Sequence, residues 1–250
     1  MASPSSAHFT QNSPGPLAAS YQLLVVTAPA WSSTAGQLLR FARAERDGAW
    51  QAVGAALPVS LGRNGMAWGR GLHLPMSGVE KIEGDGCAPA GIFAVTALFG
   101  VAPADSPLAR AARLPYLPAM PDLKAIDDPA SAYYNRIVDQ SAITPDWASC
   151  EDMLRDDERY AVGAVVAHNA GPVVPGAGSC IFLHVRAGEG VPTAGCTAMA
   201  LADMMALAAW LDGAAKPLLV QLPQAEYDAR RAAWGLPALT TCGDSRRSAG

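Results

Sequence analysis

The amino-acid sequence predicts one large, β-rich domain with few helices. Short runs of apolar residues alternate with polar ones, as in half-buried strands, and glycine, proline and Asn-Gly signals separate these runs. One segment, residues 197–212, carries an apolar pattern long enough to predict a substantial helix. The chain has 250 residues, 50% of them hydrophobic, which is enough to bury one sizeable core rather than two small ones.

The expected elements follow from these patterns in chain order. The expected strands are residues 22–27, 38–43, 50–53, 58–68, 92–98, 162–169, 180–186 and 217–222. The expected helices are residues 149–159, 197–212 and 226–234. The apolar stripe of the second helix is Leu201, Met204, Met205, Ala208 and Leu211. Residues 101–130 are rich in proline and are predicted to form a long surface excursion of the kind that edges a binding cleft.

Composition limits the organisation and the partners of the chain. Residues 1–20 are expected to form a disordered leader, 21–223 the main domain, and 224–250 a C-terminal helix and tail. The leader lacks the basic start and continuous apolar stretch of a secretory signal peptide. The net charge is −4 and the pI about 5.5, without a cluster of Lys and Arg, so nucleic acid is not an expected partner. No apolar run is long enough to predict a membrane span.

A histidine and a cysteine, His184 and Cys196, are the strongest candidates for chemistry. His184 lies in a predicted strand, and Cys196 follows a short turn directly before the predicted helix 197–212. A nearby imidazole and the positive end of a helix both favour loss of the thiol proton, which would make Cys196 an acyl-transfer nucleophile. The alternative is a buried, inert cysteine beside an ordinary strand histidine, and these residues alone leave both readings open.

Strand alternation adds an arginine to the same face as the histidine. Ile181, Leu183 and Val185 are apolar and are expected to face the core, which places His184 and Arg186 on the opposite face. Arg186 would then lie about 7 Å along the strand from His184. It is a candidate to bind a substrate carboxylate, and the alternative is a solvated strand residue.

Two further polar groups are candidates for substrate contacts. His168 and Asn169 end a predicted strand before a loop rich in glycine and proline. Tyr134, Asn135 and Arg136 offer a phenol, an amide and a guanidinium. For the first pair the alternative is a polar cap on a strand end, and for the second group it is a surface strand with aromatic packing.

A zinc site is the main chemical alternative to a catalytic thiol. His168, His184, Cys180 and Cys196 include the right ligand types. However, Cys180 and His184 would be roughly 13 Å apart along a strand, too far to share one ion easily. No phosphate-binding or dinucleotide motif is present either, so neither a metal nor a cofactor is expected.

The five cysteines form an odd set. With Cys196 free as nucleophile, the other four could pair in three ways. The reduced state is preferred, and a bridge between Cys87 and Cys150 is the open alternative.

The segment from His184 to Cys196 resembles the signature of the L,D-transpeptidase (YkuD-domain) family. That signature is a strand histidine, a loop of variable length, and Ser/Thr-His-Gly-Cys with an arginine two residues after the cysteine. Here alanines stand in place of the second histidine and the arginine, at Ala194 and Ala198. The resemblance is to a divergent bacterial branch and spans about residues 22–222, through the stretches 61–65, 68–73, 81–91, 127–129, 133–136 and 166–169.

The resemblance implies a mainly β fold, a sandwich-like pair of mixed sheets with a helix behind the nucleophile. It implies peptidoglycan L,D-transpeptidation: Cys196 attacks a stem-peptide carbonyl to give a thioester, and an acceptor amine resolves it into a crosslink. His184 is the expected base, and the N–H groups of Cys196 and Gly195 are expected to stabilise the oxyanion. The expected substrate-binding residues are Arg186, Thr193, His168, Asn169, Tyr134, Asn135 and Arg136.

The expected partners are peptidoglycan stem peptides and carbapenem β-lactams, at a periplasmic or cell-wall location. Two other functions stay open. In an L,D-carboxypeptidase, water would resolve the same thioester. In a wall-binding module, the fold would persist without turnover, a reading that Ala198 in place of the family arginine keeps open.

Overall fold

The computed structural model describes residues 15–239. Most of the predicted leader, and the end of the predicted tail with Cys242, lie outside the described residues. Leu17 is already buried in the main core, and Arg43 donates hydrogen bonds to the carbonyls of Leu17 and Ser20. No helix in the described part of the chain is long and apolar enough to cross a membrane.

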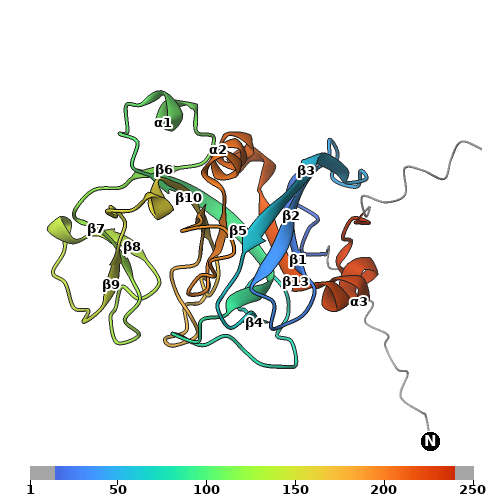
Figure 1. The fold of residues 1–250 in the computed structure, drawn as a ribbon, viewed down its shortest axis with the longest axis horizontal. Helices are drawn as coiled ribbons and strands as arrows, with labels where there is room; N and C mark the ends of the chain where they lie inside the picture. The colour runs from blue at the N-terminus through green and yellow to red at the C-terminus, as the bar shows by residue number, and fades with distance from the viewer. Residues whose placement is uncertain (1–14, 240–250) are drawn as a thin grey trace, which may run out of the picture.

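A ten-stranded mixed sheet forms the body of the molecule (Figure 1). Its strands are β1 (Gln22–Ala28), β2 (Ala35–Ala42), β3 (Gln51–Ser60), β4 (Met66–Trp68), β5 (Ala88–Gly100), β6 (Tyr116–Pro118), β10 (Val162–Val166), β11 (Phe182–Val185), β12 (Thr197–Met199) and β13 (Leu218–Pro223). The order is β10-β11-β12-β3-β2-β1-β13-β5-β4, with β6 beside β5. Because β5 also pairs with β10, the sheet closes on itself in a barrel-like way. The predicted mainly β class with mixed sheets is confirmed.

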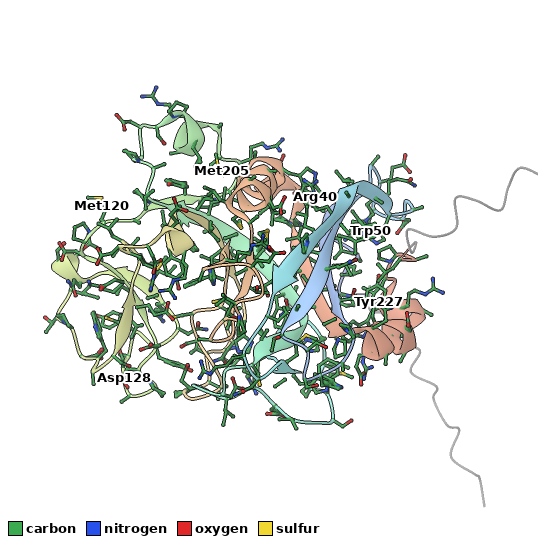
Figure 2. All side chains as sticks on the ribbon, in the orientation of Figure 1. Arg40, Trp50, Met120, Asp128, Met205 and Tyr227 are labelled. Atoms are coloured by element: carbon green, nitrogen blue, oxygen red, sulfur yellow. The ribbon has the colours of Figure 1, made fainter. Side chains whose placement is uncertain are left out.

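Residues 101–160, called the lobe below, form a smaller unit beside the main sheet and contribute one strand, β6, to that sheet. The lobe holds α1 (Pro107–Ala111) and a three-stranded sheet of β7 (Leu123–Ile126), β8 (Ile137–Asp139) and β9 (Cys150–Asp152). Figure 1 shows these three strands on the left, on the far side of β5 and β10 from β1–β3. In Figure 2 the labelled side chains Met120 and Asp128 mark the lobe, and Arg40 and Trp50 mark the opposite end. The proline-rich excursion predicted for residues 101–130 is therefore the first half of this lobe.

Two apolar clusters hold these parts together. The larger one fills the main sheet, and Ile181, Leu183 and Val185 belong to it, as strand alternation predicted. The smaller one lies between the main sheet and the lobe, where the rings of Phe99, Tyr160 and Phe182 pack edge to face with centroids 5.1–5.7 Å apart. Cys180 and Cys196 belong to this second cluster. The candidate nucleophile therefore lies at the junction of the main sheet and the lobe.

Two longer helices follow β12. Helix α2 (Leu201–Trp210) packs against β10 and β11, and α3 (Gln224–Trp234) packs against β1 and β13. Tyr227 anchors α3, because its ring is fully buried and its hydroxyl donates to the carbonyl of Pro237 at 2.8 Å. The prediction of helix 226–234 is confirmed, and α3 begins two residues earlier.

The prediction of one helix over residues 197–212 is wrong at its start. Thr197–Met199 is a buried strand that pairs in parallel with β11, and the helix begins only at Leu201. Backbone pairing with β11 overrides the helical pattern, because an apolar run alone does not separate a buried strand from a helix. Of the predicted apolar stripe, Met204, Ala208 and Leu211 are buried, whereas Leu201 and Met205 are exposed, and Leu207 is buried instead.

The prediction of a helix over residues 149–159 is also wrong. Residues 150–152 form β9, which pairs with β7, and only Glu158–Tyr160 form one 3₁₀ turn, η2. The carboxylate of Asp157 caps this turn by accepting from the N–H of Arg159. Pairing with β7 satisfies the backbone in extended form, and the acidic run that follows favours a cap rather than a helix interior.

Candidate active site

A cavity of about 230 Å³ lies between β11, the turn that follows it and the end of the lobe. The lobe contributes Glu151, Arg155, Arg159 and Tyr160. The main sheet and its turn contribute His184, Thr193 and Cys196. The structure therefore brings the predicted thiol and imidazole to one cavity and adds four lobe residues that sequence reasoning did not assign to the site.

The turn 193–196 holds Cys196 in place through one hydroxyl. Thr193 Oγ1 donates to the carbonyl of Cys196 at 2.6 Å and accepts from the N–H of Gly195 at 3.1 Å. Gly195 has φ +151°, and a Cβ there would come within 3.0 Å of the carbonyl oxygen of Cys87. The backbone therefore needs glycine at this position, both for its conformation and for the close approach of a neighbouring chain segment.

Cys196 is a protonated thiol at neutral pH. Its side chain is 9% exposed, and Sγ accepts from the N–H of Phe182 at 3.3 Å and lies 3.6 Å from the carbonyl oxygen of Cys180. Burial, and after it the negative charge of Glu151, raise the pKa of the thiol to about 12. The expected support from a helix end is absent, because β12 stands between Cys196 and the start of α2. The expectation that the imidazole and a helix end favour the thiolate is therefore wrong.

His184 is oriented as a neutral base. Its Nδ1 lies 2.8 Å from the carbonyl oxygen of Val185, which can only accept, so Nδ1 carries the proton and Nε2 keeps its lone pair. No residue between 15 and 239 forms a hydrogen bond with Nε2. The ring packs edge to face on Tyr160, and burial lowers the pKa of His184 to about 4.

Two acids and a lysine surround the turn and the cavity. The hydroxyl of Tyr160 donates to the carboxylate of Glu151, and burial raises the pKa of Glu151. On the other side of the turn, Lys81 and Asp85 form a buried ion pair at 2.7 Å, and a Cβ on Gly195 would lie 3.5 Å from Lys81 Nζ. The positive charge of Lys81 opposes, in part, the effect of Glu151 on the thiol pKa.

Two arginines of the lobe line the cavity and share one carboxylate. Arg155 binds Asp157 through Nε and Nη2 at 3.1 and 3.2 Å, and Arg159 binds it through Nε at 2.8 Å and Nη2 at 2.5 Å. The guanidinium of Arg155 also lies 5.2 Å from the centre of the Tyr160 ring. These arginines were missed from the sequence because residues 149–159 were predicted to form a helix, where the spacing of four reads as an ordinary surface pair.

The predicted His168 and Asn169 lie outside the cavity and are fully engaged by backbone groups. His168 Nε2 donates to the carbonyl of Ala177 at 2.9 Å, and Nδ1 accepts from the N–H of Arg70 at 3.2 Å. The amide of Asn169 donates to Val174 and Gly178 and accepts from the N–H of Val174. Both side chains thus hold the loop 170–178 against the end of β10.

Tyr134 and Asn135 connect the lobe to the main sheet. The Tyr134 hydroxyl donates to Glu83, which also accepts from Ser179. Asn135 donates to the carbonyls of His168 and Asn169 and accepts from the N–H of Cys180. Their polar atoms are bound within the protein in this arrangement.

The two arginines predicted to bind substrate lie elsewhere. Arg136 is exposed and lines a different cavity of about 220 Å³, together with Cys180. Arg186 is half-buried just after β11 and is not among the residues that line the cavity of Cys196. Of the predicted substrate-binding residues, only Thr193 shares the cavity with Cys196 and His184.

Cavity size alone does not identify the site. Cavities of about 440 and 540 Å³ lie around Trp68, and the second of them contains Cys87. No histidine lines the cavity of Cys87. All four cysteines in the described part of the chain are free, so Cys87 and Cys150 form no bridge, and no group of three or more metal-ligating side chains is found there.

This fold and this cavity define a mainly β protein with a thiol and an imidazole on one small cavity. The model of the L,D-transpeptidase catalytic domain (YkuD) family matches residues 37–222. The chain therefore belongs to this family, as the resemblance of its sequence indicated, and its function is related to peptidoglycan. No curated protein and no solved structure matches the chain.

Proposed function

We propose that the protein is a peptidoglycan L,D-transpeptidase with Cys196 as nucleophile and His184 as base. One observation carries the proposal: Cys196 and His184 line the same cavity, and Nδ1 of His184 is tied to the carbonyl of Val185 so that Nε2 keeps its lone pair. The tautomer needed for a general base is thus set before substrate binds.

The first half of the reaction forms a thioester. Cys196 Sγ attacks the carbonyl of an L-centre in the donor stem peptide while its proton passes to Nε2 of His184. The S–C bond forms, the C–N bond breaks, and the imidazolium returns the proton to the leaving amine. Since the pKa of the thiol is about 12, proton transfer accompanies attack rather than preceding it.

The second half transfers the acyl group. An acceptor amine attacks the thioester, His184 removes its proton, and Cys196 leaves and regains a proton from the imidazolium. The N–H of Gly195 is already bound to Thr193 Oγ1, so the N–H of Cys196 is the proposed donor to the oxyanion. Neither step requires a metal or a cofactor.

The test is incubation with purified muropeptides and identification of the products by mass spectrometry. The expected product is a crosslinked or exchanged stem peptide that is absent with Cys196→Ala. A product with a free carboxylate and no acceptor would instead assign the protein as an L,D-carboxypeptidase. Binding of muropeptides without any product would assign it as a wall-binding module and refute the proposal.

A carbapenem gives an independent measurement of the same thiol. The strained β-lactam carbonyl accepts Sγ without an acceptor peptide, so intact-mass spectrometry should detect one adduct on the wild-type protein. The adduct should be absent from Cys196→Ala. An adduct on another residue, or none at high concentration, would count against Cys196 as nucleophile.

A further inference from the structure

We propose that Arg155 and Arg159 are the residues of this chain that bind the C-terminal carboxylate of the donor, so that the lobe selects the donor through these two side chains. This inference rests on the proposed acyl transfer at Cys196. It assigns to the lobe a role in selecting the donor, while the main sheet supplies the nucleophile and the base.

The positions of the two arginines support this role. Both line the cavity that contains Cys196 and His184, and they come from a different part of the chain. The position two residues after the cysteine is Ala198, which is buried and carries no charge. Arg155 and Arg159 are therefore the cations that the cavity offers to an anionic group.

Asp157 orients the two guanidinium groups without using all of their donors. It engages Nε and Nη2 of both arginines, and within the described chain Nη1 of neither arginine has a hydrogen-bond partner. Two guanidiniums share one carboxylate, so the cluster of Arg155, Arg159 and Asp157 carries a net positive charge. A planar, fixed guanidinium with free N–H groups is suited to a carboxylate.

The other acid of the cavity does not neutralise these arginines by direct pairing. The carboxylate of Glu151 accepts from Tyr160, and neither arginine forms an ion pair with it within residues 15–239. Burial raises the pKa of Glu151, and the Tyr160 hydroxyl, not a guanidinium, is the side-chain group that binds its carboxylate.

The size of the cavity favours a chain end. Its volume of about 230 Å³ is below the roughly 300–1,000 Å³ of common ligand pockets, which suits a short group beyond the attacked bond better than a long one. In a terminal residue, only the amide nitrogen and Cα separate the attacked carbonyl from the carboxylate. A donor seated on Cys196 therefore places its terminal carboxylate within the same small space as the arginines.

A bound carboxylate would also assist the base. Besides burial, the charges of Arg159 and Arg155 lower the pKa of His184. An anion on these arginines offsets their charge, which stabilises the imidazolium formed during attack. Donor binding and activation of the base are thus coupled through the same two side chains.

The experiment compares two donor peptides that differ only in a C-terminal carboxylate or amide. We expect wild-type kcat/KM to favour the carboxylate by at least about 30-fold, or roughly 2 kcal/mol. In Arg155→Gln/Arg159→Gln this ratio should fall to about one, because the carboxylate donor loses the two groups that distinguish it from the amide donor. Compared with that double variant, Arg155→Gln/Arg159→Lys should restore part of the ratio, since lysine keeps the charge but lacks the planar fork. Arg110→Gln, an exposed lobe arginine outside the cavity, is the matched control and should keep the full ratio.

Three outcomes would overturn the inference. The ratio could survive in the double variant, both donors could lose activity equally as for a purely structural clamp, or Arg186→Gln could abolish the ratio instead. Calorimetry on Cys196→Ala with the two peptides, each with an uncleaved bond, separates this inference from the proposed function. Tighter binding of the carboxylate peptide, lost with the arginines, would support the inference even if the wild-type protein transferred no acyl group.

Discussion

Two buried histidines in neighbouring strands illustrate what makes a side chain available for chemistry. His184 on β11 is 6% exposed and His168 just after β10 is 1% exposed, and burial lowers the pKa of each to about 4. Both ring nitrogens of His168 have backbone partners, whereas Nε2 of His184 has none within residues 15–239. Neither burial nor a shifted pKa therefore distinguishes the base; a nitrogen left without a partner beside a thiol does.

The largest expected effect is the loss of turnover when Cys196 is replaced, since its thiol is the group whose proton His184 is proposed to accept. Cys196→Ala should lower turnover of a muropeptide donor by at least about 10⁴-fold while the thermal midpoint stays close to that of the wild type, because only a sulfur nucleophile forms the acyl-enzyme. Cys150→Ala removes a half-buried thiol of the lobe and serves as the matched control. Substantial turnover by folded Cys196→Ala would contradict the proposal, because His184 would then differ from His168 by its position beside a thiol that has no role in the reaction.

The comparison is tested directly by replacing each histidine in turn. His184→Ala should lower kcat/KM by about 10²–10⁴-fold with a small change in stability, as expected for a general base. His168→Ala should leave kcat of the folded protein within severalfold and lower the free energy of unfolding by about 1–3 kcal/mol, because two buried backbone groups lose their partners. Denaturant unfolding and steady-state kinetics on both variants give the result. Equal kinetic losses would mean that the two histidines do not differ in role.

The feature that the histidines share predicts a dependence of stability on pH. Each has a folded-state pKa of about 4 and an unfolded value near 6.5, so the unfolded state binds more protons below pH 6.5. The stabilising effect is complete above about pH 6.5 and is lost as the pH falls toward 4. Burial lowers the pKa of His73 to about 4 as well, so up to three protons contribute, with a slope of up to roughly 4 kcal/mol per unit. Urea unfolding from pH 7 to 4.5 measures this slope. His184→Gln should reduce it by about a third, and a flat wild-type profile would contradict the neutral state of these rings.

A smaller effect is expected at the turn that brings Cys196 to His184. Gly195→Ala should cost about 1–3 kcal/mol of stability and lower kcat, because φ is +151° and the new Cβ meets the carbonyl of Cys87 at 3.0 Å. Gly190→Ala is the control, since Gly190 also has positive φ but a Cβ there meets no atom within 4 Å. If both variants lose the same stability and keep the same kcat, crowding at Gly195 has no role in placing the thiol.

The smallest effect concerns the charge that opposes the thiolate. Glu151→Gln removes a negative charge that raises the pKa of Cys196, so alkylation by iodoacetamide at pH 8 should become about threefold faster or more. Asp152→Asn, at the exposed neighbouring carboxylate, should leave the rate unchanged. An unchanged rate in Glu151→Gln would place the cause of the raised pKa in burial alone.

The strand that carries His184 was predictable from the alternation of its residues, although the structure buries both of its faces. Ile181, Leu183 and Val185 alternate with polar or aromatic neighbours, and this period of two specifies both the strand and the side of His184. That His184 and Cys196 act on the same site was predictable too, because both belong to the family signature, which occupies one short stretch of the sequence that ends in the Gly-Cys turn. Both predictions depend on local pattern alone.

The rest of the site depends on contacts between distant parts of the chain. Thr197–Met199 reads as the start of a helix until β11 is present beside it as a pairing partner. Arg155 and Arg159 look like helix-surface residues until β9 pairs with β7 and Asp157 turns them toward the cavity. His168 looked as available as His184, because no local pattern reveals that Ala177 and Arg70 occupy its nitrogens.

The junction between the main sheet and the lobe has a consequence for how such a protein diversifies. The groups proposed to break and form bonds belong to β11 and its turn, whereas the charged wall belongs to a segment of the chain that ends at Tyr160. Substitutions in that wall alter what the thiol meets while the sheet that carries it keeps its pairing. Exchanging residues 150–160 between homologous chains is thus a direct route to retarget the reaction, and natural selection has the same route open to it.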